Sequence, residues 1–139
     1  MDECIFCNFT DDEVVFYSDD LCYGAISLDP VNKHHLLVIP REHHVNFIDV
    51  PDDLAAHVFL VAKRLSRALR EVTAPISVHH ISNDDLVGDY NKVQHYKFHV
   101  IPRYPENGVM MSAERGNDTL EQRAGYAADI ARQLAAFVD

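Results

Sequence analysis

The order of the predicted elements in this 139-residue sequence indicates an α+β fold built on an antiparallel sheet. Three observations support it: short β-rich runs come first, an amphipathic helix follows, and further strands precede a second helix. The chain has no internal repeat and no Gly-, Pro- or Ser-rich stretch typical of a linker. We therefore expect one domain over residues 1–139, long enough to bury a core without disulfides.

The first third of the chain predicts three strands. Residues 14–17, 22–28 and 35–39 are rich in β-forming residues. The clusters at 18–20 and 29–32, which separate them, contain the Ser, Asp, Asn and Pro residues typical of turns. We therefore expect each run to form one short strand.

Residues 51–71 predict the first helix. Pro51 stands at its start, and Asp52 and Asp53 in the first turn suit the positive end of the helix dipole. Apolar residues recur at steps of three and four, which places them on one face: Leu54, Val58, Val61, Leu65 and Leu69.

Two more strands are predicted at 76–81 and 93–101, joined through a polar loop at 82–90 that holds three aspartates and Gly88. Residues alternate strictly along the later strand. One face carries Tyr96, Phe98 and Val100, and the other carries His95, Lys97 and His99. We expect the second face to be functional, because it is too rich in reactive groups for a merely solvated surface.

The last segment, 117–138, reads as a second helix with Asn117 or Asp118 as its N-cap. Its apolar residues follow near-helical spacing: Leu120, Tyr126, Ile130, Leu134 and Phe137. We expect the preceding segment, 105–116, to be an ordered loop at the rim of a pocket or at a dimer contact.

The net charge of −10 argues against general binding to nucleic acid or to an anionic membrane, because acidic groups repel phosphate. A small molecule or a protein is the more natural partner. No apolar run approaches the ~20 residues of a membrane helix, and the first residues are acidic where a signal peptide would be basic. We therefore expect a cytoplasmic protein.

Cysteines and histidines are the most informative residues. Cys4 and Cys7 have the Cys-x-x-Cys spacing that favours metal or redox chemistry in the cytosol, whereas Cys22 lies among apolar neighbours and is expected to be a buried, inert thiol. Nine histidines are present, and eight of them stand in clusters: His34 and His35, His43 and His44, His79 and His80, His95 and His99.

Three motifs in order resemble those of the histidine-triad (HIT) family. They are Cys-Ile-Phe-Cys at 4–7, His-His-Leu-Leu-Val-Ile-Pro-Arg-Glu-His at 34–43, and His-Tyr-Lys-Phe-His-Val-Ile-Pro-Arg at 95–103. The resemblance covers about residues 3–104. It implies a HIT-like fold with a five-stranded antiparallel sheet and two main helices.

The resemblance to zinc-containing bacterial members also implies a metal site. Carried over position by position, its ligands are Cys4, Cys7, His43 and His95. Two thiolates and two imidazoles form a closed tetrahedral site, which is the structural type of zinc site. His44 stands beside His43 as the alternative ligand.

The sequence departs from the family in the expected pocket. Lys97 occupies the position of the nucleophilic histidine, and a lysine with its usual pKa is protonated at neutral pH and cannot attack phosphorus. The ribose-binding acidic or amide residue is Ser27, and the glycine before His35 is His34. We also expect Asp84 and Asp85 to oppose a phosphate group.

These departures favour an enzyme with a reassigned pocket, in which Lys97 acts with His35 and His99 on a small molecule. Lys97 could serve as nucleophile, general base, Schiff-base former or charged anchor. The pocket would be shaped by Ser27, Asn83, Tyr90 and Asn91. The alternatives are the usual family reaction on nucleoside phosphoramidates or dinucleoside polyphosphates, and a non-catalytic ligand-binding or regulatory module.

The resemblance further implies a symmetric homodimer, formed through the first helix and the edge of the sheet. Candidate contact residues on the helix are Leu60, Ala56 and Leu69.

Overall fold

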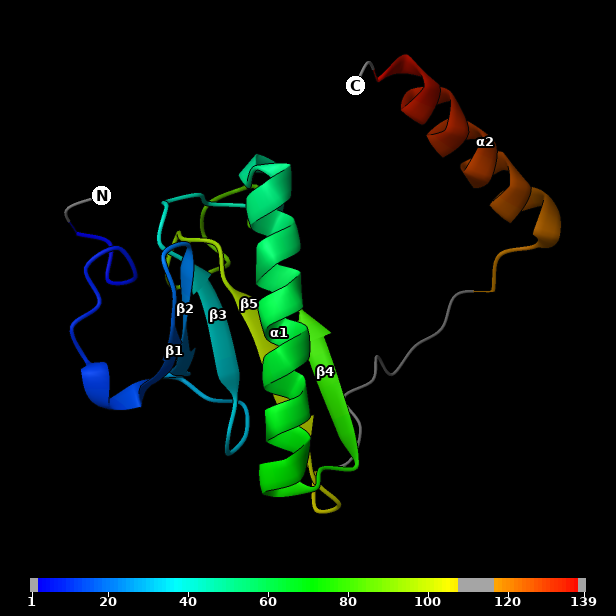
Figure 1. The fold of residues 1–139 in the computed structure, drawn as a ribbon. Coiled ribbons are helices and arrows are strands. Elements are labelled where there is room, and N and C mark those ends of the chain that lie inside the picture. Colours follow the sequence, from blue (N-terminus) through cyan, green and yellow to red (C-terminus); the bar gives the residue numbers. More distant parts are fainter. Residues whose placement is uncertain (1–2, 108–116, 138–139) are drawn as a thin grey trace.

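The computed structural model describes residues 3–107 and 117–137. Its five strands form one antiparallel sheet in the order β1-β2-β3-β5-β4, which confirms the predicted fold class (Figure 1). The strands are β1 (Val15–Ser18), β2 (Cys22–Ile26), β3 (Leu36–Pro40), β4 (Ser77–Ile81) and β5 (Phe98–Arg103). The helices are α1 (Asp52–Thr73), α2 (Leu120–Ala136) and the short 3-10 turns η1 (Asp12–Val14) and η2 (Phe47–Asp49).

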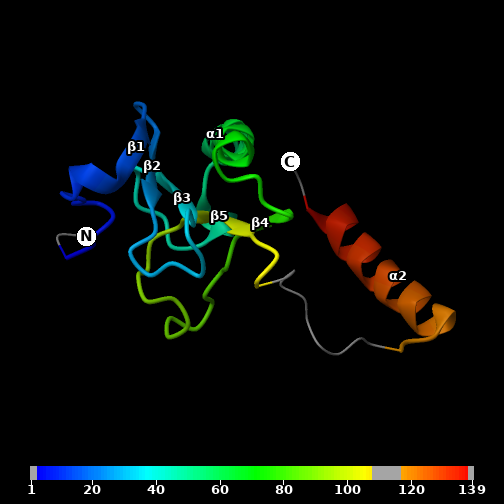
Figure 2. The same cartoon turned by 90° about the horizontal axis from the view of Figure 1, so that it is seen from below.

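Helix α1 lies across one face of the sheet, and the long loop between β4 and β5 lies on the other side (Figure 2). The predicted apolar stripe of α1 makes the main core, because those side chains meet the sheet residues that face them. Its buried members include Val38, Val58, Val61, Leu69 and Val100.

A second apolar cluster lies on the opposite face of the sheet. The N-terminal segment covers this face with Phe6, and Tyr23 Oη donates a hydrogen bond of 2.8 Å to the Phe6 carbonyl. Every residue of β3 is buried, since both faces of this central strand are covered. This explains why the β3 sequence reads as a continuous apolar run rather than as an alternating one.

Two predicted strands are shorter than expected. The second ends at Ile26, so that Ser27 and Leu28 follow it, and the fifth begins at Phe98 rather than at residue 93. Residues 93–97 do not pair with a neighbouring strand, yet the predicted division of faces holds. Tyr96 and Phe98 belong to the core under α1, whereas Lys97 lines a cavity on the other face.

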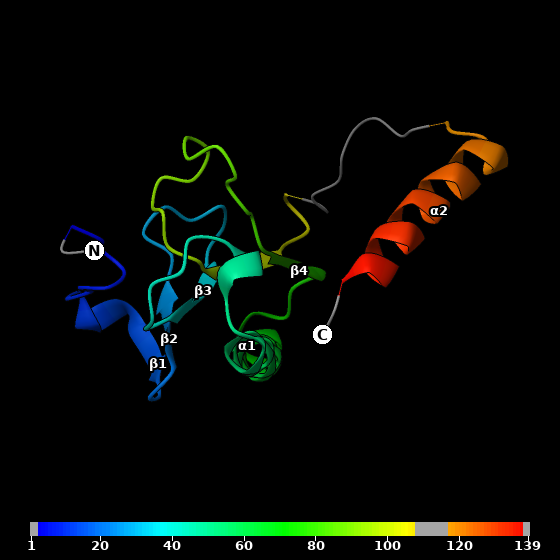
Figure 3. The same ribbon diagram turned by 90° about the horizontal axis from the view of Figure 1, so that it is seen from above.

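Helix α2 forms as predicted but does not join the core. Its N-cap is Thr119, not Asn117 or Asp118: the Thr119 hydroxyl accepts from Gln122 N–H while the Gln122 side chain accepts from Thr119 N–H. All residues of α2 are exposed, and the helix stands apart from the sheet, beyond β4 (Figure 3). Most of the loop predicted at 105–116 lies outside the described residues.

Neither helix in the described part of the chain combines the length and the apolar composition needed to cross a bilayer.

Candidate functional site

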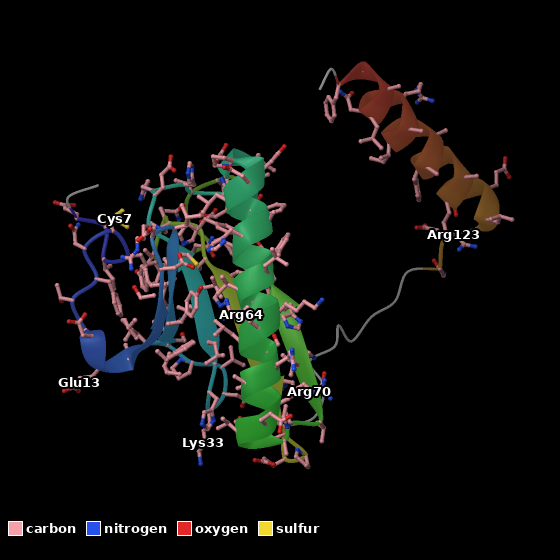
Figure 4. The ribbon with its side chains drawn as sticks, in the orientation of Figure 1. Cys7, Glu13, Lys33, Arg64, Arg70 and Arg123 are labelled. Atoms are coloured by element: carbon pink, nitrogen blue, oxygen red, sulfur yellow. The ribbon has the colours of Figure 1, made fainter. Side chains whose placement is uncertain are left out.

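Four potential metal ligands come together at one end of the sheet. Cys4 and Cys7 lie on the N-terminal segment, where Figure 4 labels Cys7, while His43 follows β3 and His95 precedes β5. Cys4 Sγ lies 3.4 Å from His95 Nδ1, Cys7 Sγ lies 3.2 Å from His43 Nδ1, and the two Nδ1 atoms are 3.2 Å apart. All four ligand atoms fall within 4.8 Å of one another.

This spacing fits a tetrahedral zinc ion. Zn–N bonds of about 2.0 Å and Zn–S bonds of about 2.3 Å place neighbouring ligand atoms roughly 3.3–3.8 Å apart. His95 Nε2 donates a hydrogen bond of 2.8 Å to the Pro40 carbonyl, which leaves Nδ1 as the ligand atom. His44 lies outside the cluster and faces Glu42, with its Nε2 3.3 Å from a carboxylate oxygen.

A cavity of about 330 Å³ opens on the face of the sheet opposite α1. Its walls include apolar side chains, among them Ile5, Leu28 and Val93. The structure brings all seven predicted pocket residues around it: Ser27, His35, Asn83, Tyr90, Asn91, Lys97 and His99. They come from three separate segments of the chain, so only the fold brings them together.

Hydrogen bonds determine which nitrogens of His35 and His99 carry protons. The Val31 N–H donates to His35 Nδ1 at 3.0 Å, so the proton of neutral His35 must be on Nε2. That Nε2 lies 2.9 Å from His99 Nδ1, which therefore accepts. The proton of neutral His99 is consequently on Nε2, and the ring retains one N–H donor at the cavity.

Burial keeps both rings neutral. Burial, together with neighbouring positive charge on His35 and Lys97, lowers the pKa of His99 to about 4. Burial also lowers the pKa of His35, although the Asp29 carboxylate partly opposes this effect. At neutral pH both rings are therefore uncharged, and the N–H on His99 Nε2 can donate a hydrogen bond to an acceptor oxygen.

Lys97 is held by backbone acceptors at the cavity. Its Nζ donates to the carbonyls of Val93 at 3.0 Å and His95 at 3.1 Å, and it lies 5.5 Å from the centre of the Phe6 ring. Burial lowers the pKa of Lys97, whereas a negative charge on Cys4 raises it. An amine that donates to two carbonyls directs N–H groups, not a lone pair, at its surroundings.

The expectation that Asp84 and Asp85 face a phosphate is wrong. Neither residue lines the cavity. The Asp84 carboxylate accepts from Phe47 N–H, and the buried Asp85 carboxylate accepts from N–H groups of its own loop: Val87, Gly88, Tyr90, Asn91 and Gln94 Nε2. These donors, led by Asn91 and Gln94, hold the pKa of Asp85 well below its usual range.

Asp85 is thus the organiser of the loop that carries Tyr90 and Asn91 into the cavity wall. Its sequence signal was the Asp-x-x-Gly spacing to Gly88, which has a φ of 85° and allows the loop to turn back on the carboxylate. Sequence reasoning also missed Asp29 and Lys92, which line the cavity and form an exposed ion pair with each other.

The predicted state of Cys22 is confirmed. Its side chain is fully buried, and burial together with the nearby Asp19 carboxylate raises the pKa of the thiol to about 12. Cys22 is therefore a protonated, unreactive thiol at neutral pH.

Comparison with known proteins gives a consistent result. The HIT domain family matches residues 8–106. An uncharacterised HIT-like protein of Borreliella burgdorferi is 33% identical over 121 residues, covering 84% of this chain and 86% of that protein. A yeast adenosine 5'-monophosphoramidase (Saccharomyces cerevisiae) is 27% identical over 111 residues, covering 78% of this chain and 67% of the enzyme.

Two solved structures are also similar. The crystal structure of a HIT family member from Bacillus subtilis has a TM-score of 0.81 at 26% identity and covers 99% of both chains. A zinc-bound histidine triad family protein from Mycobacterium smegmatis has a TM-score of 0.67 at 29% identity, covering 97% of this chain and 98% of that one.

Proposed function

Because the chain belongs to the HIT family, we propose that it is a zinc-containing enzyme of that family that binds an anionic small molecule in the 330 Å³ cavity. Lys97 stands in place of the family's nucleophilic histidine and serves as a fixed donor to the substrate. His99, backed by His35, provides a second donor. The reaction proceeds without a covalent nucleotidyl-histidine adduct.

The hydrogen-bond chain from Val31 through His35 to His99 carries this proposal. It places the proton of neutral His99 on Nε2, and because this ring lines the cavity, a phosphate or carboxylate oxygen bound there would accept from that N–H. The buried position of the pair strengthens that bond, because little water competes for the same acceptor. The apolar walls then leave room for the uncharged part of the substrate.

The contacts of Lys97 favour an anchoring role over a nucleophilic one. Two of its three N–H groups are occupied by backbone carbonyls, which keeps Nζ at a defined place in the cavity. A substrate oxygen can take the third. A nucleophile or Schiff-base former needs a lone pair aimed at the substrate, and both carbonyl contacts oppose that state.

Cys4, Cys7, His43 and His95 would hold a structural zinc ion. Their spacing fits a closed tetrahedron, and a similar protein from Mycobacterium smegmatis is described as zinc-bound. Four protein ligands leave no position for water, so zinc would stabilise the fold without taking part in the reaction.

A second candidate is hydrolysis of nucleoside phosphoramidates. The yeast relative, named as an adenosine 5'-monophosphoramidase, favours it. The same cavity would then hold the nucleotide, and Lys97 would have to be compatible with cleavage at phosphorus. Adenosine phosphoramidate is therefore included in the test.

Two ligands are used to measure binding. The first is the molecule that the purified protein retains, identified by mass spectrometry, and the second is inorganic phosphate. Calorimetry should show that Lys97→Met weakens binding by ~10- to 100-fold, because a hydrogen bond to a charged group contributes ~1.5–3 kcal/mol. Lys97→Arg should keep part of the affinity, since it retains the charge. His99→Asn should weaken binding less than Lys97→Met, because its N–H is neutral.

Lys33→Met is the matched control, because Lys33 does not line this cavity (Figure 4). Zinc content should be the same in all four variants, and all four should remain folded at the temperature of the binding measurement. If Lys97→Met binds both probes as tightly as the parent, the anchoring role is wrong. If the parent hydrolyses adenosine phosphoramidate rapidly, the phosphoramidase function replaces the first proposal. If the protein binds a retained molecule but does not convert it, it is a non-catalytic ligand-binding module.

A further inference from the structure

Two oppositely charged side chains stand together at the wall of the cavity. Asp29 follows β2, Lys92 lies in the loop that leads to β5, and the Lys92 ammonium group donates a hydrogen bond to the Asp29 carboxylate. Both side chains are mostly exposed. Exposed ion pairs contribute little to the stability of a fold, so this pair matters chiefly through the charge that it presents to the cavity.

The electric field of the Asp29 carboxylate reaches the interior of the cavity. Its negative charge acts on His35 and partly opposes the lowering of the His35 pKa by burial. A sphere of 330 Å³ is about 9 Å across, which is less than the Debye length of about 10 Å at an ionic strength of about 0.1 M. A ligand anywhere in the cavity therefore interacts with the charge on Asp29.

The charges around the cavity nearly cancel. Three of the described residues that line it are charged at neutral pH, namely Asp29, Lys92 and Lys97, while both cavity histidines are buried and neutral. The charges of Asp29 and Lys92 offset each other. A zinc ion in the neighbouring cluster would add no net charge, because its two thiolates balance it. One net positive charge remains, on Lys97.

This balance makes the charge of the ligand important. Coulomb energy is proportional to the ligand charge, so Asp29 repels a dianion twice as strongly as a monoanion at the same place. Only Lys92 could match a second negative charge on the ligand. Lys92 would then have to leave Asp29, and that carboxylate would remain unpaired beside the ligand.

We propose, on the basis of the proposed function, that Asp29 sets the charge selectivity of the cavity: by neutralising Lys92, it makes the site favour singly charged anions over doubly charged ones. The substrate is then a carboxylate, or a phosphorus acid with one ionised oxygen, on an uncharged body that packs on the apolar walls. Asp29 determines specificity through its charge and takes no part in bond breaking.

Three probes that share a phenyl ring measure this selectivity in the full-length, zinc-loaded protein. At about pH 8 phenylphosphonate carries two negative charges, whereas its monomethyl ester and benzoate carry one each. Calorimetry at low salt gives the dissociation constant of each probe. The parent should bind both monoanions more tightly than the dianion, and the tighter monoanion identifies the acid as a carboxylic or a phosphorus acid. A parent that prefers phenylphosphonate would overturn the proposal.

Asp29→Asn removes the charge and keeps the shape of the side chain. Binding of each monoanion should strengthen about two- to threefold, because a unit charge about 8 Å away in water has an effect of this size. Binding of the dianion should strengthen about four- to ninefold, because the logarithm of the gain doubles with the ligand charge. At about 1 M salt these gains should largely disappear. Equal gains for all three probes would mean that the ion pair only shapes the cavity, and the charge selectivity would be wrong.

Asp20→Asn is the matched control for the loss of one negative charge. Asp20 lies in the turn between β1 and β2, at the other end of β2 from Asp29, and does not line the cavity. This variant should bind all three probes as the parent does. The same gains as in Asp29→Asn would show an effect of overall charge and would contradict a specific role of Asp29.

Lys97→Met separates this proposal from the proposed function. It should weaken the binding of all three probes. If it weakens none of them, the proposed function fails, and the selectivity proposal fails with it. If it weakens all three while Asp29→Asn leaves their relative affinities unchanged, only the selectivity proposal is wrong.

Discussion

His34 adopts a backbone conformation that normally belongs to glycine. Its φ is 65°, in the left-handed region, where a side chain costs on the order of 1 kcal/mol. The family resemblance has a glycine at this position, and the structure supplies the physical reason. Tyr104 Oη contacts His34 Nδ1 at 3.3 Å and donates to the Lys33 carbonyl at 3.0 Å, which helps to hold the bend that delivers His35 to the cavity.

Titration of His99 gives a prediction at the scale of one residue. Its pKa is about 4 in the folded chain against about 6.5 when unfolded, so between these values the unfolded state binds more protons. The stability associated with neutral His99 is complete above pH 6.5 and is lost as the pH falls towards 4. We expect its imidazole resonance, followed by NMR, to titrate with a midpoint near 4.

His99→Asn assigns that resonance and provides the comparison. Acid also protonates the metal ligands, but it does so in both proteins, so the difference between their stability profiles isolates His99. The variant should lose less stability than the parent between pH 6.5 and 4. A midpoint at 6 or above would contradict the burial of the ring and the hydrogen bond from His35.

At the scale of elements, the N-terminal segment supplies two of the four residues that could hold a metal ion. Except for η1, the described residues before β1 form no regular element, and they are attached to the sheet through Phe6 and the two cysteines. The same segment supplies Ile5 and Phe6 to the cavity wall. Release of the metal should therefore loosen the cavity as well as the segment.

We expect about one zinc ion per chain by elemental analysis. Removal of zinc with a chelator should lower the melting temperature by roughly 10 °C or more, because metal binding is part of the folding free energy. Cys7→Ser should have the same effect and should expose the N-terminal segment to protease.

Cys22→Ala is the matched control for the loss of a cysteine. This side chain is buried in the core and lies outside the four-ligand cluster, so the variant should bind zinc normally. A protein that holds no zinc, and whose melting temperature does not rise when zinc is added, would show that the ligand assignment is wrong.

At the scale of the whole molecule, we propose a homodimer through α1 and the edge of β4. The structure corrects one of the expected contact residues: Leu69 is buried in the core of its own chain and cannot reach a partner, whereas Leu60 is exposed. Pairing of β4 with its copy would extend the sheet and cover an edge that is otherwise open to aggregation.

Leu60→Lys should weaken this dimer by about 10-fold or more, measured by light scattering over a dilution series. Leu21→Lys is the control, because Leu21 is similarly exposed but lies in the turn between β1 and β2, near the opposite edge of the sheet. A monomer mass for the parent at micromolar concentration would contradict the dimer. If the Leu60→Lys variant dimerises as tightly as the parent, the contact does not include this part of α1.

Periodicity and motifs predicted much of the architecture. The stripe from Leu54 to Leu69 placed α1, and alternation from residue 95 to 100 correctly separated core from cavity even where no regular strand forms. Boundaries were less exact, because a strand ends where its partner ends. The sequence predicted that α2 is a helix but did not predict that it is exposed, because apolar spacing does not identify the surface on which a helix packs.

The sequence by itself determined the order of the elements, the family, and the set of cysteines and histidines able to bind a metal, since these depend on local spacing and residue type. Only the tertiary structure decided that His43 rather than His44 joins the cluster, that His99 keeps its proton on Nε2, and that Asp85 organises a loop instead of facing the cavity. These outcomes depend on hydrogen bonds and burial, and both are set by segments that meet only when the chain is folded.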